Sequence, residues 1–199
     1  DVIQSTISDL PDYDPEMNSD IKEANVKRAI NLIAKISTLV ASWGRIRTGK
    51  EPIEPLGADV NHAANFLYML TNEIPSKEES RIFDISLILH AEHSFNASTF
   101  AALEIASTRA HMYACIGCAI GALSVELHGG ANIQVMKMLL EIENVDRVDR
   151  WVKTRLDRGE RVMGMGHAVY KTTDPRADIL ARLSKIISRR KGTPWYDIT

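Results

Sequence analysis

Apolar residues recur at helical spacing along almost the whole chain, and no segment of useful length alternates apolar and polar positions with a period of two. The longest helical run follows the possible caps Asn18, Ser19 and Asp20 and continues to Gly49. One stripe of this run is predicted to be buried, and it consists of Ile21, Ala29, Ile33, Ile36, Val40 and Trp43. The pattern predicts an all-α fold.

Capping signals fix where two further helices begin. Ser76 and Glu79 form a capping box for a helix that we expect to end at His90. Asp174 followed by Pro175 predicts another helix start, because proline fits the first helical position, where its missing N–H would have no partner anyway. The remaining helical runs cover residues 60–70 (with Asp59 as the expected cap), 131–142 and 145–156.

Residues 99–124 carry a small side chain at every fourth position, which predicts one helix with a narrow face. The row consists of Ala102, Ala106, Ala110, Ala114, Cys118 and Ala122. Gly117 and Gly121 flatten an adjoining face further. Because small side chains let helix backbones approach closely, we expect a tight contact with another helix or with a second subunit here.

Composition excludes several classes of protein. The chain has 199 residues, 45% of them apolar and 25% charged, with a formal net charge of -2, which argues against a disordered chain, collagen or a nucleic-acid-binding polycation. No apolar run reaches the ~18 residues of a membrane span. Two cysteines are too few for a disulfide framework. Residues 1–4 show neither an initiator Met nor a signal peptide, so we expect the interior of a longer chain.

His90 and His93 stand three positions apart at an expected helix end, where they would face the same way. This spacing suits two metal-ligating histidines. It equally suits a pair without a metal, in which one imidazole bonds to the backbone and the other lies in a polar pocket. His90-Ala91-Glu92, with Cys115 and Cys118 downstream, imitates the zinc deaminase pattern, although Ala114 stands where that pattern has proline. We therefore interpret the cysteines as small packing residues and keep a zinc site of His90, Cys115 and Cys118 as the alternative.

His128 precedes a predicted helix and is followed by Gly129 and Gly130. The positive end of the helix dipole opposes protonation of an imidazole there, so we expect His128 to be neutral. A neutral imidazole can donate its N–H to a carbonyl oxygen on which charge develops during enolisation. The alternative is a histidine packed in a glycine-rich turn.

A third cluster favours anion binding. Gly164-Met165-Gly166-His167 is predicted to be a loop, with residues 168–170 extended, and the cations Lys171 and Arg176 follow. Arginine can hold a carboxylate through two parallel hydrogen bonds, and lysine can act as a point charge toward a phosphate. The Gly-Lys-Ser/Thr ending of a nucleotide P-loop is missing from this segment.

Together these clusters resemble the citrate synthase family over essentially the whole chain. The matching motifs are HAEHSFNASTF at 90–100, LHGGAN at 127–132 and GMGHAVYKTTDPR at 164–176, in the family's order and spacing. NFLYML at 65–70 is similar to the bacterial and archaeal branch. The family places an aromatic residue where Met165 stands, which puts the packing behind His167 in doubt.

The resemblance implies an acyltransferase of class EC 2.3.3, which condenses acetyl-CoA with oxaloacetate at the entry to the tricarboxylic acid cycle and hydrolyses the citryl thioester. His128 and His167 match the catalytic histidines, and His93, His167 and Arg176 match oxaloacetate ligands. His90 would orient its neighbour. The residues that match the coenzyme A side of the cleft are Arg161, Val162, Met163, Gly164, Gly166 and Lys171. Neither a metal nor a tightly bound cofactor is implied, since coenzyme A enters as part of a substrate.

The family architecture further implies part of a large helical domain over residues 1–127 and the start of a small domain over 128–199. The implied protein is a cytoplasmic homodimer that binds neither membrane nor nucleic acid, and residues 99–124 are the candidate dimer contact. The family's catalytic aspartate would lie beyond Thr199, so we expect roughly half an enzyme with little or no turnover. A 2-methylcitrate synthase, which uses propionyl-CoA, and a non-catalytic helical scaffold remain open.

Overall fold

The computed structural model describes residues 2–125, 128–166 and 170–199. These residues form ten α-helices and two 3-10 helices, and no β-strand occurs among them. The predicted all-α fold is therefore confirmed. No helix within the described ranges is both long and apolar enough to cross a membrane. The chain divides into two compact units, Asp1–Ser124 and Val125–Thr199.

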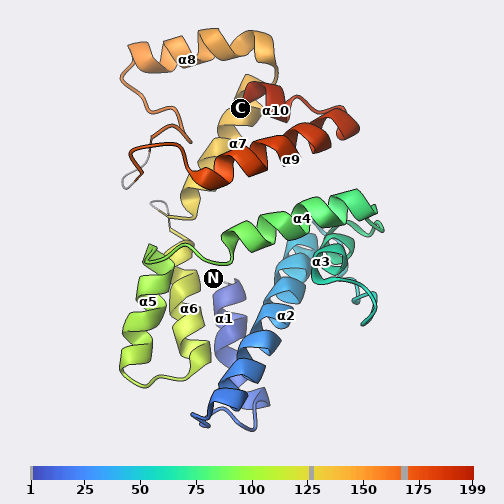
Figure 1. Ribbon diagram of the computed structural model, residues 1–199, viewed down its shortest axis with the longest axis vertical. Helices are drawn as coiled ribbons and strands as arrows, with labels where there is room; N and C mark the ends of the chain where they lie inside the picture. The colour runs from blue at the N-terminus through green and yellow to red at the C-terminus, as the bar shows by residue number, and fades with distance from the viewer. Residues whose placement is uncertain (1, 126–127, 167–169) are drawn as a thin grey trace. The chain divides into compact units, whose positions relative to one another are not determined.

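The first unit is built around the helices α1, α2 and α6 (Figure 1). Its elements are α1 (Val2–Asp9), η1 (Leu10–Tyr13), α2 (Lys22–Ile46), α3 (His62–Thr71), α4 (Lys77–His90), α5 (Ala97–Ser107) and α6 (Met112–Leu123). The core consists of Ile7 from α1, Leu32 from α2 and Tyr113 from α6. Phe66 of α3 stacks on Phe83 of α4 with ring centroids 5.1 Å apart, which joins these two helices.

Helix α2 buries a different face from the predicted one. Ile33 and Val40 of the predicted stripe are exposed. The buried positions are Ala24, Arg28, Leu32, Ala41 and Arg45. The two arginines can be buried because their guanidinium groups have internal acceptors. Arg45, for example, donates to the carbonyl oxygens of Glu51 at 2.6 Å and Leu70 at 3.3 Å. Hydrophobic periodicity cannot register a buried cation. The predicted stripe is therefore wrong at Ile21, Ile33 and Val40, whereas Ile36 packs against the core.

The caps agree largely with the sequence. The capping box of Ser76 and Glu79 is present at the start of α4, as predicted. Helix α3 is capped by Asn61, whose side chain accepts the N–H of Ala64, rather than by Asp59. The helix therefore begins at His62, two residues later than the Asp59 cap would imply.

The single helix predicted over residues 99–124 is wrong. Helix α5 ends at Ser107, the chain reverses through Arg109 with φ +63°, and α6 begins at Met112, so that the two helices form a hairpin (Figure 1). His111 caps α6, because its Nδ1 accepts the backbone N–H of Ala114 at 3.2 Å. This side-chain cap replaces the intrahelical bonds that a continuous helix would have made.

The predicted close approach of a glycine face is confirmed within the unit. A Cβ atom on Gly121 would lie 2.8 Å from Nε2 of Gln4, and one on Gly117 would lie 3.7 Å from Oγ of Ser8. Both contacts are with α1. The two glycines therefore let α1 and α6 pack closely inside the chain.

The second unit has a small core between its first and last helices. Its elements are α7 (Gly130–Ile142), η2 (Val145–Arg147), α8 (Val148–Asp157), α9 (Pro175–Lys191) and α10 (Trp195–Ile198). Leu139 and Ile142 of α7 pack with Ile198 of α10, and Val148 and Trp151 cover them from α8. Helix α9 begins as predicted, with Asp174 as its cap and Pro175 as its first residue.

Candidate active site

His93 lies in the loop between α4 and α5 and is half-buried. The loop turns sharply just after it, since Ser94 has φ +53° and donates its N–H to the Glu92 carboxylate. Asn96 then caps α5. The predicted common helix face of His90 and His93 is wrong, because α4 ends at His90 and His93 lies beyond it.

His90 bonds to its own helix. Its Nδ1 lies 2.6 Å from the carbonyl oxygen of Ser86, one turn earlier on α4, which agrees with the alternative of a backbone-bonded imidazole. Cys115 is buried, and this burial raises the pKa of its thiol, so that a reactive thiolate is disfavoured. In the part of the chain that the structure describes, no three His, Cys, Asp or Glu side chains are placed to hold a metal ion. The zinc site of His90, Cys115 and Cys118 is therefore wrong.

His128 lies just before the N-cap of α7, Gly129, as the sequence predicts, and its side chain is half-buried. The backbone N–H groups of His128 and Gly130 both donate to the carbonyl oxygen of Val125, at 3.2 and 3.0 Å. These two bonds hold the backbone of His128 and Gly130 to Val125 at the start of α7.

The predicted coenzyme A loop, residues 161–166, lies alongside α7 (Figure 1). Gly164 and Gly166 have φ +85° and +84°, a region that side chains disfavour, and a Cβ on Gly164 would lie 3.5 Å from Val135 of α7. Met165, between the glycines, is 71% exposed. The loop therefore needs both glycines and leaves its backbone accessible between them. Of the flanking predicted residues, Arg161 and Lys171 are exposed, and Val162 and Met163 are half-buried.

Arg176, in the first turn of α9, already holds a carboxylate in two-point geometry. Its Nε lies 3.0 Å from Oδ1 of Asp174 and its Nη2 lies 2.6 Å from Oδ2. The bond to Asp174 raises the pKa of the guanidinium, and Tyr170 adds to this effect. The pair is only partly buried, with side chains 25% and 27% exposed. A carboxylate ligand can therefore reach the guanidinium from solvent.

The sequence alone does not predict this pairing, because its pattern indicates only a helix cap at Asp174. Asp174 has both functions, since its Oδ1 also accepts the backbone N–H of Arg176 at 2.9 Å. The sequence feature that could indicate this ion pair is the acidic cap residue, Asp174, two positions before Arg176.

The predicted site residues are distributed over the two units. His93 belongs to the first unit, and His128 and Arg176 belong to the second. His167, with residues 168 and 169 of the predicted extended segment, lies outside the described residues. The family resemblance implies that His93, His128, His167 and Arg176 line one crevice, and this stays a prediction.

Comparisons with known proteins agree with the motifs. A family model described as the C-terminal domain of citrate synthase matches residues 1–199. The citrate synthase of Deinococcus radiodurans is 42% identical over 194 residues, which cover 98% of this chain and 51% of that protein. The citrate/2-methylcitrate synthase of Bacillus subtilis is 43% identical over 178 residues, which cover 89% of this chain and 48% of that protein.

A solved structure is similar as well. Citrate synthase from Thermoplasma acidophilum, in a ternary complex with carboxymethyl coenzyme A and oxaloacetate, superimposes with a TM-score of 0.84 at 29% identity, covering 98% of this chain and 51% of that one. The chain thus spans about half the length of the relatives it matches. Because the family model matches all 199 residues and these relatives are similar over nearly the whole chain, the chain belongs to the citrate synthase family.

Proposed function

We propose that the protein containing this chain is a citrate synthase, which condenses acetyl-CoA with oxaloacetate and releases citrate and coenzyme A. The observation that carries the proposal is the match of the family over all 199 residues, including the motifs around His93, His128 and Arg176. The relative from Thermoplasma acidophilum, solved with oxaloacetate and a coenzyme A derivative, supports the choice of substrates.

In the proposed reaction His128 donates an N–H to the thioester carbonyl of acetyl-CoA. The family's aspartate removes a methyl proton, and negative charge moves onto the oxygen that His128 stabilises. The enol carbon then bonds to the keto carbon of oxaloacetate, whose oxygen takes a proton from His167. Water cleaves the citryl thioester, so that the thiol leaves as coenzyme A. No tightly bound cofactor takes part.

Arg176 and His93 would hold the carboxylates of oxaloacetate. The contact between Arg176 and Asp174 supports this role, because the guanidinium is already oriented for a two-point bond and remains accessible. An incoming carboxylate would exchange for Asp174 and would be held by the same two donors. The exposed backbone around Gly164 and Gly166 would receive coenzyme A.

The test uses the complete protein and follows thiol release from acetyl-CoA. Removing one donor to a developing oxyanion costs ~10²- to 10³-fold, so we expect that loss in kcat for His128→Ala. Arg176→Gln should mainly raise KM for oxaloacetate. Arg182→Gln, an exposed arginine farther along α9, is the matched control and should behave as wild type. Unchanged kinetics in both site variants would refute the proposal.

The isolated 199-residue chain should release little or no thiol from the same substrates. Loss of a general base alone costs ~10²- to 10⁴-fold. Steady turnover by the isolated chain would contradict the assignment of the base to the other half of the protein.

A 2-methylcitrate synthase is the second candidate, favoured by the dual name of the Bacillus subtilis relative. Comparing kcat/KM for acetyl-CoA and propionyl-CoA in the complete protein decides between them. A preference for acetyl-CoA is expected.

We further propose a cytoplasmic homodimer in which α5 and α6 take part. Phe100 and Leu103 of α5 and Leu123 of α6 are about half exposed, which suits burial against a second subunit. Light scattering of the complete protein should give twice the mass of one chain. A monomer would refute this part of the proposal.

A further inference from the structure

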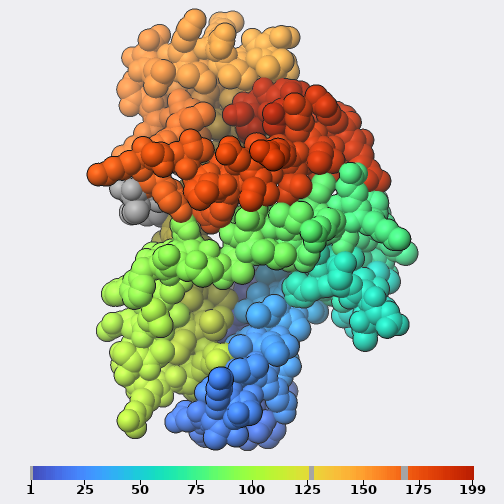
Figure 2. Space-filling view, viewed as in Figure 1, coloured from blue at the N-terminus to red at the C-terminus, as the bar shows by residue number. Residues whose placement is uncertain are grey.

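Helix α8, with its N-cap Arg147, presents four arginines toward one cleft. These are Arg147, Arg150, Arg155 and Arg158. Because 3.6 residues make one turn, positions 147, 150, 154 and 158 fall on the same side of the helix, and positions 151 and 155 flank them. The cleft has a volume of about 530 Å³. It is lined by Glu141, Arg147, Arg150, Trp151, Thr154, Arg155, Arg158 and Glu160. Figure 2 shows α8 at the surface of the second unit.

Two of the four arginines already have counter-charges. Arg147 pairs with Glu143, and Arg155 pairs with Glu160 and, at 3.3 Å, with Glu141. The guanidinium of Arg155 also lies 4.7 Å from the centroid of the Trp151 ring. The hydrogen bond from Trp151 lowers the pKa of Glu141, and Arg155 adds to the effect. These groups hold one another in place and form the wall of the cleft.

The other two arginines, Arg150 and Arg158, are exposed, and no acidic side chain within the described ranges pairs with either. A cation at the C-terminus of a helix is favoured by the helix dipole, which accounts for Arg158. The dipole does not account for Arg150, which lies in the first turn of the helix, where a cation is disfavoured. Four arginines and two glutamates line the cleft, which therefore carries an excess of positive charge among the described residues.

We propose that this cleft binds an oligophosphate, with one phosphate group at Arg150 and another at Arg158. Arginine is suited to phosphate because its planar fork makes two parallel charge-assisted bonds. At a rise of 1.5 Å per residue, the Cα atoms of Arg150 and Arg158 are about 12 Å apart. Two linked phosphate groups can therefore contact both arginines better than a single phosphate group can. The residues concerned lie outside the loop 161–166, and the inference does not depend on the proposed function.

Isothermal titration of the 199-residue chain with inorganic tripolyphosphate tests the proposal. We expect saturable binding with one site per chain, and binding at least tenfold weaker in Arg150→Gln/Arg158→Gln. The matched control is Lys137→Gln/Lys153→Gln, which removes the same charge from exposed positions that do not line the cleft. This control should bind within twofold of wild type. Circular dichroism should show equal helix content in all three proteins.

Three outcomes would overturn the proposal. Equal weakening in both double variants would mean that only net charge attracts the ligand. Orthophosphate binding as tightly as tripolyphosphate would refute the two-arginine site. Displacement of tripolyphosphate by coenzyme A, with the loop variant Lys171→Gln losing both ligands, would place the anion in the coenzyme A loop. ATP binding as tightly as tripolyphosphate supports recognition of the phosphate chain alone, whichever molecule supplies it.

Discussion

Two arginines of the chain bind an aspartate in opposite surroundings. Arg28, in the first unit, has a side chain only 3% exposed, and its Nε lies 2.8 Å from Oδ2 of Asp14. Arg176, in the second unit, bonds Asp174 with both side chains about one quarter exposed. The chemical groups are the same, and what differs is their access to water.

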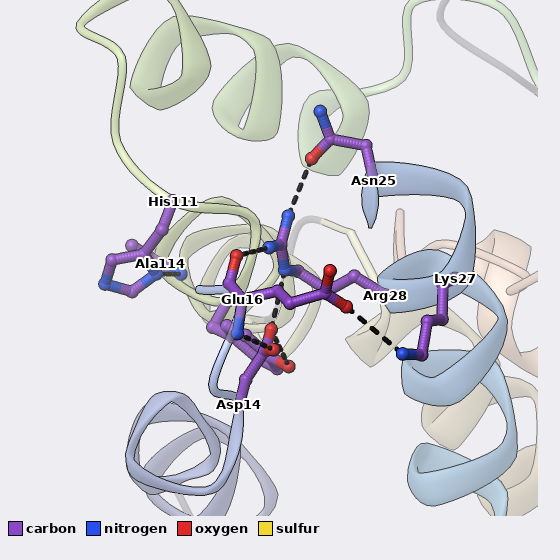
Figure 3. A network of polar contacts seen from close by, with 8 residues as sticks. Asp14, Glu16, Asn25, Lys27, Arg28, His111 and Ala114 are labelled. Atoms are coloured by element: carbon purple, nitrogen blue, oxygen red, sulfur yellow. Dashed lines mark hydrogen bonds and ion pairs between the residues drawn. The ribbon is translucent and has the colours of Figure 1, made fainter. Parts of the chain in front are cut away.

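The difference separates a structural contact from an exchangeable one. All the polar groups around Arg28 come from the chain: Nη1 lies 2.7 Å from Oδ1 of Asn25, and Nη2 donates to the carbonyl oxygen of Glu16 (Figure 3). Three of the five guanidinium N–H groups are held in this way, and a side chain only 3% exposed gives a ligand little access to the others. Arg176 has a nearby, solvent-accessible partner. In the proposed role of Arg176, a carboxylate would replace this partner without leaving a buried charge unpaired.

The largest predicted effect is the loss of the buried arginine. Arg28→Ala leaves Asp14 with no cation and the acceptors of Asn25 and Glu16 with no donor. Breaking a buried ion pair in this way costs about 3–5 kcal/mol, and we expect a decrease of that size in the free energy of unfolding. Urea unfolding of the chain, followed by circular dichroism, measures it.

Lys27→Ala is the matched control for that experiment. Lys27 is the neighbour of Arg28 on α2, and its ion pair with Glu16 is exposed. Exposed pairs contribute about 0–1 kcal/mol, so the control should stay close to wild type. Equal losses in the two variants would show that burial does not distinguish these contacts.

The hydroxyl of Tyr113 is the second support of Asp14, to whose Oδ2 it donates at 2.9 Å. Tyr113→Phe removes this bond, and a decrease of about 1 kcal/mol in the free energy of unfolding is expected at neutral pH. Tyr13→Phe, at a position 77% exposed, should cost nothing measurable. A larger loss at position 13 than at 113 would contradict the network.

Tyr113→Phe should also change how the free energy of unfolding depends on pH above pH 10. Burial, aided by Asp14, raises the pKa of Tyr113 above the ordinary 10.0. The protonated form is thus favoured in the folded state, so its stabilisation is complete below 10.0 and is lost as pH rises through the folded value. Urea midpoints above pH 10 should fall more steeply for wild type than for Tyr113→Phe.

At acid pH the carboxyl of Asp14 makes the free energy of unfolding depend on pH in the opposite direction. The hydrogen bond from Arg28 holds the pKa of Asp14 below the ordinary 3.8, and the bond from Tyr113 acts in the same direction. Its contribution is therefore complete above 3.8 and is lost as pH falls through the folded value. The wild-type urea midpoint should decrease with acidification more steeply than that of Asp14→Asn. Parallel curves would contradict the assignment.

The sequence predicted what is decided locally. The capping box of Ser76 and the Asp174-Pro175 start were correct because every partner lies within three residues. The burial of Arg28 could not be predicted in this way, since it depends on Asp14 across a turn and on Tyr113 from a distant helix. The break at Arg109 was missed because the turn contains no glycine, proline or asparagine.

In the candidate site, too, some features followed from the local sequence and others only from the structure. The position of His128 before a helix followed from the two glycines after it, and the structure confirms it. The bond between Asp174 and Arg176 required the actual course of the chain at the start of α9. Motif spacing identified the residues, whereas their present partners came only from the structure.

Arg176→Gln should have the smallest effect on stability of the non-control variants. Its pair with Asp174 is partly exposed, so the free energy of unfolding should fall by about 1 kcal/mol or less, several times less than for Arg28→Ala. Asp174 keeps its capping bond to the backbone N–H of residue 176, which the substitution does not touch. Urea unfolding at neutral pH measures this difference. A loss as large as that of Arg28→Ala would mean that Arg176 is a structural residue, and its partner could then not be exchanged for a substrate carboxylate.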